Sequence, residues 1–385
     1  MSDCSALFAP LQQGLARLEQ ERLRRRHRVV DSATGRFALV EGRQLLNFCA
    51  NDYLGLATAP ALAGAAQVAL SRYGSGSGAS HLVCGHLRPH QTLAERLAQF
   101  LGLPAALTFA TGYLANLAVP TALLGRGDAV FADRLNHASL NDGCLLSRAD
   151  FVRYPHNDLD ALARRLEASS ARVRLIAVDA VFSMDGDLAP LDRLLALAER
   201  YDAWLYLDDA HGFGVLGQGR GSLAHWGIAS PRIIYMATLG KAAGSAGAVV
   251  AGDPVLIEWL QNRARSYIYT TAAPPAVAAT TLAALDLIEA DSWRREQLRQ
   301  HIERLRSGLA GTCYRLMDST TPIQPILLPD NATALALAEA LFERGLWVAA
   351  IRPPTVPTPR LRITLSAAHE AADIDRLLEA LKDLQ

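Results

Sequence analysis

The chain has 385 residues, with 38 basic and 38 acidic side chains, so its formal net charge at pH 7 is zero. This balance argues against a broad surface that binds nucleic acid, and the half of the residues that are hydrophobic can form a large core. The five cysteines are scattered without a Cys-x-x-Cys pair, which argues against a disulfide framework or a structural zinc site. The chain also shows no secretion signal and no membrane-length apolar segment, so we expect a cytoplasmic protein that binds neither membranes nor metal.

The N-terminal region predicts a helix followed by a hairpin. Residues 5–28 carry leucines near helical spacing and finish in a basic run, Arg22 to Arg28, which predicts one amphipathic helix. Basic residues at such a helix end often only complement the helix dipole and stay in water. Residues 36–48 predict a hairpin that turns at Glu41-Gly42.

The glycine-dense stretch 74–81 predicts a flexible loop near the active site. A dinucleotide-binding fingerprint is excluded because His81 stands where the third glycine of G-x-G-x-x-G would fall and no apolar strand precedes it. His86 and His90 are four residues apart with Pro89 between them, so a zinc-binding helix is a poor interpretation.

Between residues 105 and 251, short apolar runs alternate with helical stretches. The runs cover residues 105–109, 129–132, 173–178, 203–207, 233–237 and 248–250. This alternation predicts an α/β fold in which a mostly parallel sheet is covered by helices on both faces. Ligands of such sheets bind at the carboxyl ends of the strands, and each candidate residue in this region follows one of the runs.

Two of these runs end in the residues that indicate the chemistry. The run 203–207 is followed by Asp208 and His211, and the run 233–237 is followed by Thr238 and by Lys241 among small residues. A buried lysine is a nucleophilic amine that can form a Schiff base with an aldehyde cofactor, and a carboxylate can keep the ring nitrogen of pyridoxal phosphate protonated. Alone, Asp208 could be a helix cap and Lys241 a loop lysine, but the order of the two motifs favours the cofactor.

The motifs Asp208-x-x-His211 and Thr238-x-Gly240-Lys241-Ala242 resemble the cofactor signature of the α-oxoamine synthases. These are fold-type I pyridoxal phosphate enzymes that condense an amino acid with an acyl thioester and release carbon dioxide. The resemblance runs from about residue 15 to the C-terminus, and the segment 350–357 is most similar to the 8-amino-7-oxononanoate synthases of biotin synthesis. It implies condensation of L-alanine with a pimeloyl group carried by coenzyme A or an acyl-carrier protein. A sister synthase such as glycine C-acetyltransferase is the alternative.

The resemblance also implies the roles of individual residues. Lys241, Asp208 and His137 would be catalytic: Lys241 as the cofactor anchor and base, Asp208 at the ring nitrogen, and His137 stacked on the ring. The cofactor would also contact Gly112, Tyr113, Ser183, His211 and Thr238, and Thr270 and Thr271 would reach the phosphate of the neighbouring subunit. This last pair implies a homodimer with shared active sites. The substrate-binding residues would be Arg24, Asn51, His137, Thr355 and Arg362, with Arg362 holding the amino acid carboxylate and Arg24 contributing to the acyl site.

The C-terminal part predicts a second, smaller α/β unit. A charged helix over 293–309 precedes a strand over 323–328, a helix over 332–343 and a strand over 347–351. Residues 360–364 alternate like a further strand. We therefore expect three parts: an N-terminal helix and hairpin segment (1–50), a large cofactor-binding domain (51–290) and a small C-terminal domain (291–385).

Overall fold

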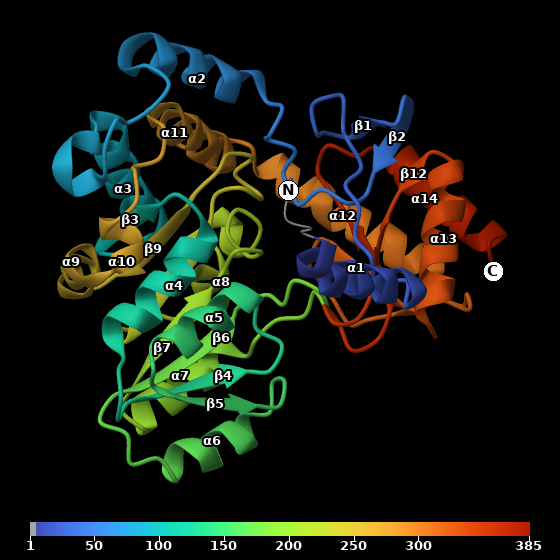
Figure 1. Ribbon diagram of the computed structural model, residues 1–385. Helices are drawn as coiled ribbons and strands as arrows, with labels where there is room; N and C mark the ends of the chain where they lie inside the picture. The colour runs from blue at the N-terminus through green and yellow to red at the C-terminus, as the bar shows by residue number, and fades with distance from the viewer. Residues whose placement is uncertain (1–4) are drawn as a thin grey trace.

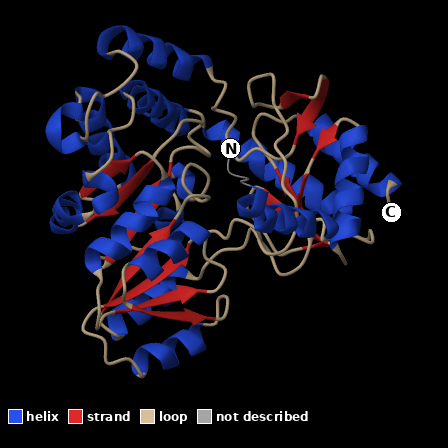
Figure 2. Ribbon diagram, in the orientation of Figure 1, coloured by secondary structure: helices blue, strands red, loops and turns tan. Residues whose placement is uncertain are grey.

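The computed structural model describes residues 5–385 and contains a seven-stranded sheet in the order β3-β9-β8-β7-β6-β4-β5 (Figures 1 and 2). Its strands are β3 (Ala105–Phe109), β4 (Ala129–Asp133), β5 (Asp150–Tyr154), β6 (Arg174–Asp179), β7 (Ala203–Asp208), β8 (Ile233–Thr238) and β9 (Ala248–Gly252). Only β9 runs against the others, so the mostly parallel sheet and all six predicted strands are confirmed. The prediction missed β5, an edge strand whose partly exposed residues do not form an apolar run.

Helices cover both faces of this sheet. Successive strand residues enter opposite cores: Tyr206 belongs to one hydrophobic cluster, and its neighbours Leu205 and Leu207 belong to the other. The first face is covered by α4 (Gly112–Leu123), α5 (Ala138–Leu146), α9 (Pro254–Arg263) and α10 (Arg265–Ile268). The second face is covered by α3 (Arg88–Leu101), α6 (Leu159–Glu167), α7 (Leu191–Arg200) and α11 (Pro275–Ala290), with α2 (Pro60–Tyr73) packed on α11. Three short elements complete this part: the π-helical turn η1 (His81–Gly85), η2 (Gly217–Gly219) and α8 (Ser222–Trp226).

The C-terminal part forms a four-stranded antiparallel sheet in the order β10-β11-β14-β13. Its strands are β10 (Arg315–Leu316), β11 (Ile323–Leu327), β13 (Ala349–Ile351) and β14 (Arg360–Thr364), and its helices are α12 (Ser292–Leu309), α13 (Asn331–Glu343) and α14 (Ala371–Asp383). The prediction of a single strand over 347–351 was wrong, because the segment forms two strands separated at Val348. β12 (Leu346–Trp347) pairs with a strand of the N-terminal hairpin, and only β13 pairs with β14.

The N-terminal hairpin joins this C-terminal part. β1 (Phe37–Val40) and β2 (Arg43–Asn47) are antiparallel, and β12 pairs in parallel with β2, so segments 300 residues apart share one sheet (Figure 1). The predicted turn is confirmed: Glu41 and Gly42 have φ angles of 52° and 76°, as a two-residue hairpin turn requires.

The N-terminal helix is shorter than expected. Helix α1 (Ser5–Gln20) ends where Arg22 adopts a φ of 56°, and the backbone N–H of Leu23 donates to the Leu18 carbonyl. This closing geometry stops the helix, so the basic residues that follow are free to approach other parts of the chain. Among residues 5–385, no helix combines the length and the apolar character needed to cross a membrane.

Candidate active site

A cavity of about 200 Å³ lies where β6, β7 and β8 end and where α4 and α5 begin. It brings together eight of the predicted residues: Gly112, Tyr113, His137, Ser183, Asp208, His211, Thr238 and Lys241. This is the expected position in an α/β sheet, because the carboxyl ends of parallel strands meet at one edge.

Lys241 follows β8 and points at an imidazole. Its Nζ lies 2.9 Å from Nε2 of His211. Burial lowers the pKa of Lys241 to about 8, even though nearby carboxylates, chiefly Asp208, act in the opposite direction. A substantial fraction of the amine is therefore neutral near physiological pH, which is the form that attacks an aldehyde or takes up a proton.

His211 connects this lysine to a network that the sequence motifs did not reveal. Its Nδ1 lies 2.5 Å from the hydroxyl of Tyr53, which comes from the segment before α2. Burial and the nearby Lys241 cation lower the pKa of His211 far below its ordinary value, so the ring is neutral. The Tyr53 hydroxyl also donates to Asn51 at 3.3 Å, and the same Asn51 oxygen accepts from Arg362 at 3.2 Å. The predicted residues Asn51 and Arg362 do not line the cavity, but hydrogen bonds through Tyr53 link them to His211.

Asp208 is buried at the end of β7 and is oriented by two donors. The Asn116 side chain donates to Oδ2 at 2.8 Å, and the Ala210 backbone N–H donates to Oδ1 at 3.0 Å. Asn116 is held in turn by Tyr206, whose hydroxyl donates to its oxygen at 2.7 Å, and by a bond to Ser139 at 2.9 Å. Asn116 and Ser139 both line the cavity, and sequence reasoning missed them.

His137 stands at the N-terminus of α5, and its backbone is fixed by a buried carboxyl group. Its N–H donates to Oδ2 of Asp179 at 3.0 Å, and its Nδ1 lies 2.6 Å from the Ser139 hydroxyl. Burial, reinforced by the charge of Asp208, raises the pKa of Asp179 well above its ordinary value. Oδ1 of Asp179 is buried without a hydrogen-bond partner at the edge of the cavity.

The N-terminus of α4 provides a place for an anion. A Cβ added at Gly112 would lie 2.4 Å from Cγ2 of Thr238, so only glycine allows the helix to approach β8 this closely. The side chain of Thr111 accepts from the N–H of Leu114 and so caps this helix. The other N–H groups of the first turn have no partner within the helix and favour an anion.

A larger cavity of about 820 Å³ adjoins the site and shares His137 and Ser183 with it. It is lined by the predicted residue Thr355 and also by Arg25, whose guanidinium donates to the Thr355 hydroxyl at 3.2 Å. The predicted Arg24 instead forms an ion pair with Glu19 at 3.2 Å and does not line this cavity. Consecutive arginines point in different directions once the helix has ended, which the sequence alone did not reveal.

Thr270 and Thr271 follow α10 and lie outside both of these cavities. Their expected contact with a neighbouring subunit remains a prediction.

Comparisons with known proteins agree with this geometry. The family described as aminotransferase class I and II matches residues 43–381. An 8-amino-7-oxononanoate synthase from Herminiimonas arsenicoxydans is 59% identical over 380 residues, which cover 96% of this chain and 98% of that protein. The chain belongs to the 8-amino-7-oxononanoate synthase family.

Solved structures support this family and its fold. An 8-amino-7-oxononanoate synthase from Francisella tularensis is 32% identical, with a TM-score of 0.78, and the match covers 88% of this chain and 97% of that chain. A serine palmitoyltransferase from S. paucimobilis with a bound PLP–myriocin aldimine is 30% identical, with a TM-score of 0.92 and coverage of 100% and 98%. The resemblance to the α-oxoamine synthases and the fold-type I architecture are thus confirmed.

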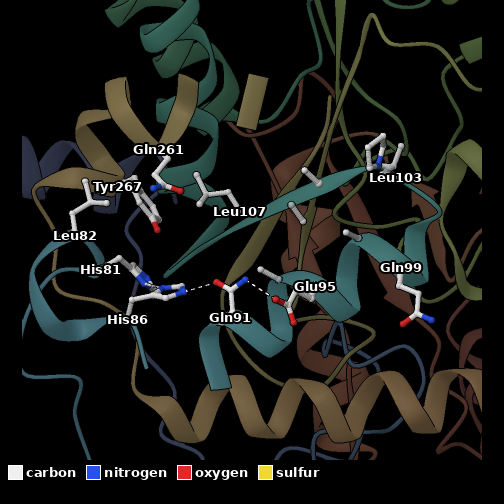
Figure 3. A pocket seen from close by; sticks show the side chains of 15 residues that line it. His81, Leu82, His86, Gln91, Glu95, Gln99, Leu103, Leu107, Gln261 and Tyr267 are labelled. Carbon is white, nitrogen blue, oxygen red and sulfur yellow. Dashed lines mark hydrogen bonds between the residues drawn. The ribbon is translucent and has the colours of Figure 1, made fainter. Parts of the chain in front are cut away.

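This member of the 8-amino-7-oxononanoate synthase family also has a histidine-lined cavity of about 680 Å³ away from the site (Figure 3). Nδ1 of His81 lies 2.9 Å from Nδ1 of His86. Nε2 of His86 in turn lies 3.0 Å from the side-chain oxygen of Gln91. The nearby His90 uses both ring nitrogens on the backbone, one toward Leu87 and one toward the Ala273 carbonyl. The three imidazoles, which lie close enough to share a metal ion, are therefore already engaged in hydrogen bonds.

Proposed function

We propose that this chain catalyses the pyridoxal 5′-phosphate-dependent condensation of L-alanine with a pimeloyl thioester. The products are 8-amino-7-oxononanoate, carbon dioxide and the free thiol carrier, as in biotin biosynthesis. The observation that carries the proposal is the meeting of Lys241 and Asp208 in one buried cavity, in a chain that matches 8-amino-7-oxononanoate synthases over nearly its full length.

The residues of the cavity fit this cofactor. Lys241 supplies the amine for its aldehyde, Asp208 the carboxylate for its ring nitrogen, and His137 a ring to stack against it. The first turn of α4, with Gly112, Tyr113 and Thr238, suits its phosphate, and Ser183 and His211 suit its phenolic oxygen. When bound, pyridoxal phosphate supplies an electron sink that accepts the electron pair left by a departing proton.

The protein supplies the proton transfers. With a pKa near 8, Lys241 can take the α-proton of alanine at Nζ and later return a proton to the product. His211 is neutral, so its Nε2 can accept a hydrogen bond from the lysine without repelling it as a second cation would. Asp208, oriented by Asn116, would stabilise the positive charge on the ring nitrogen that the electron sink needs.

The substrates would occupy the two adjoining cavities. Arg362 is buried and linked to the site through Asn51, although it lines neither cavity. Its Nε and Nη1 already donate to Ser183, Asn51 and Thr364, so Nη2 is the group left to bind the alanine carboxylate.

The pimeloyl chain fits the larger cavity, where Thr355 and Arg25 stand. Its distal carboxylate would be bound by the basic run, either by Arg24 as the resemblance implies or by Arg25, which lines the cavity.

We further propose a homodimer in which Thr270 and Thr271 contact the cofactor phosphate of the partner, and a cytoplasmic location. The four cysteines within residues 5–385 are unpaired, which suits a reducing compartment. A mixed dimer tests the shared site: a Lys241→Ala subunit and a Thr270→Ala/Thr271→Ala subunit should regain one working site when combined. Recovery of no activity in the mixture would contradict the shared arrangement.

A substrate matrix tests the reaction itself. The purified protein with pyridoxal phosphate is given alanine or glycine, each with pimeloyl-CoA, pimeloyl-acyl-carrier protein or acetyl-CoA, and the products are read by mass spectrometry. We expect 8-amino-7-oxononanoate from alanine with a pimeloyl donor. Preference for glycine with acetyl-CoA would instead establish a glycine C-acetyltransferase.

A further inference from the structure

His156 forms a bridge between two loops of the site without touching the cavity. It follows β5, and its Nδ1 lies 3.1 Å from Asp133 and its Nε2 lies 2.8 Å from Asp187. Carboxylates only accept hydrogen bonds, so both ring nitrogens must donate and the ring is an imidazolium. Burial alone would lower the pKa of His156, but the bonds to both carboxylates outweigh it and raise the pKa to about 10.

The first carboxylate shapes the turn that carries His137. Asp133 ends β4 and is fully buried, and its Oδ1 also accepts from the Leu135 N–H at 2.8 Å. Its Oδ2 accepts from the Asn157 N–H at 2.8 Å. This side chain therefore fixes the backbone between β4 and His137, which is also held by Asp179.

The second carboxylate belongs to Asp187, the last residue of the loop that carries Ser183. The N–H of Phe182 donates to the Asp187 carbonyl at 3.0 Å, so the loop 182–187 is tied at its base. The Phe182 ring stands edge-on to His156, with ring centroids 4.3 Å apart. His156 thus holds this base by both packing and charge.

Side chains of the C-terminal part also bind this loop. Arg362 donates to the Ser183 carbonyl at 2.7 Å, and Arg360 forms an ion pair with Asp185. At the tip, Gly186 packs against Ser319, whose hydroxyl donates to the Gly186 carbonyl at 2.9 Å. A shift of the loop would therefore move both Ser183 and the guanidinium proposed to bind the substrate carboxylate.

We propose that His156 is a positioning residue, whose imidazolium bridge between Asp133 and Asp187 sets the separation of the His137 turn from the Ser183 loop. The proposal rests on the function proposed above, which gives both loops their contacts with the cofactor. Loss of the imidazolium would leave Asp133 and Asp187 without their shared counter-charge, and the two loops would no longer be held at a fixed separation.

The test compares His156→Gln, which keeps a polar side chain without the charge, with Asp187→Asn, which releases only the Ser183 loop. His225→Gln, on the exposed surface of α8, is the matched control. For folded, cofactor-loaded protein we expect both bridge variants to lower kcat by about 10- to 100-fold, since small misplacements at a site cost this much. The double variant should be little worse than the worse single variant, because both break one bridge.

A second readout needs no acyl substrate and so separates this inference from the proposed reaction. Titration of the apo-protein with pyridoxal phosphate, followed by visible absorption, should show weaker binding and a shifted band in both bridge variants but not in the control. If the folded fraction of both variants keeps the wild-type absorption band, cofactor affinity and kcat, His156 is only a stabilising ion pair. If the wild-type protein makes no 8-amino-7-oxononanoate, the proposed function fails, while the cofactor titration still decides the role of the bridge.

Discussion

Lys241 owes its reactivity to neighbours that lie close in the sequence and to others that do not. The small residues around it allow burial, and this feature is visible in the sequence. The pairing with His211, and through it with Tyr53, depends on the segment before α2 reaching the sheet edge. Side chains that end strands could be predicted because each follows an apolar run. Asn116 and Ser139 could not, because they lie within helices, Asn116 one turn into α4 and Ser139 in the first turn of α5.

Replacement of Lys241 by alanine should abolish turnover. Without the amine, the protein has no group to bind the cofactor aldehyde covalently and no base to remove the α-proton. We therefore expect the rate to fall about 10³-fold or more. The chain has only one other lysine, the exposed Lys382, and Lys382→Ala is therefore a matched control that should keep full activity. Retention of more than about a tenth of the wild-type rate would exclude Lys241 as the catalytic base, since loss of a general base costs about 10²-fold or more.

The lowered pKa of Lys241 predicts how cofactor attachment depends on pH. Only the neutral amine attacks the aldehyde, so the attachment rate of the apo-protein should rise with pH and level off above about 8. Stopped-flow absorbance measures this rate, and a free lysine derivative, whose amine has an ordinary pKa near 10.4, provides the reference. A protein profile that follows the free amine would show that burial does not activate Lys241.

Among the elements, the buried strands of the central sheet were the most predictable. They are covered on both faces, so their apolar runs are uninterrupted, whereas the edge strand β5 has no such run. The end of α1 depends on one backbone angle at Arg22, and the division at Val348 depends on pairing with the distant β2. Local composition indicates neither the backbone angle at Arg22 nor the pairing of β12 with β2.

The approach of α4 to β8 gives a test at this scale. Gly112→Ala places a methyl group against Thr238, and such overpacking costs about 1–3 kcal/mol, so cofactor affinity should fall by roughly tenfold or more. Thr238→Ser removes the methyl that Gly112→Ala would meet, so the double variant should recover part of that affinity. Equal affinity of wild-type and Gly112→Ala protein in a cofactor titration would show that this contact does not shape the phosphate site.

At the scale of the whole molecule, the N-terminal and C-terminal segments form one unit. β2 pairs with β12, and the buried His369 before α14 links both parts: its Nε2 lies 3.1 Å from the Asn47 carbonyl. The proposed division at residues 50 and 290 separates segments in the sequence, and the pairing between them could not be predicted because it joins residues 300 positions apart.

His369 predicts how stability depends on pH. Burial lowers its pKa from 6.5 to about 4, so the unfolded chain binds a proton in this range that the folded chain does not. The free energy of unfolding should therefore fall as the pH falls from about 6.5 toward 4, by up to about 3 kcal/mol from this group. Denaturant unfolding should show a smaller pH dependence in His369→Gln than in the wild-type protein. An unchanged slope would show that His369 does not titrate on unfolding.

The most direct test of the central claim is to identify the residue that holds the cofactor. Borohydride reduction of the holoenzyme, followed by digestion and peptide mass mapping, fixes the pyridoxyl group to its lysine. With only Lys241 and Lys382 in the chain, the assignment is unambiguous, and we expect the label on Lys241 alone. A label on Lys382, or no label on either lysine, would contradict the account.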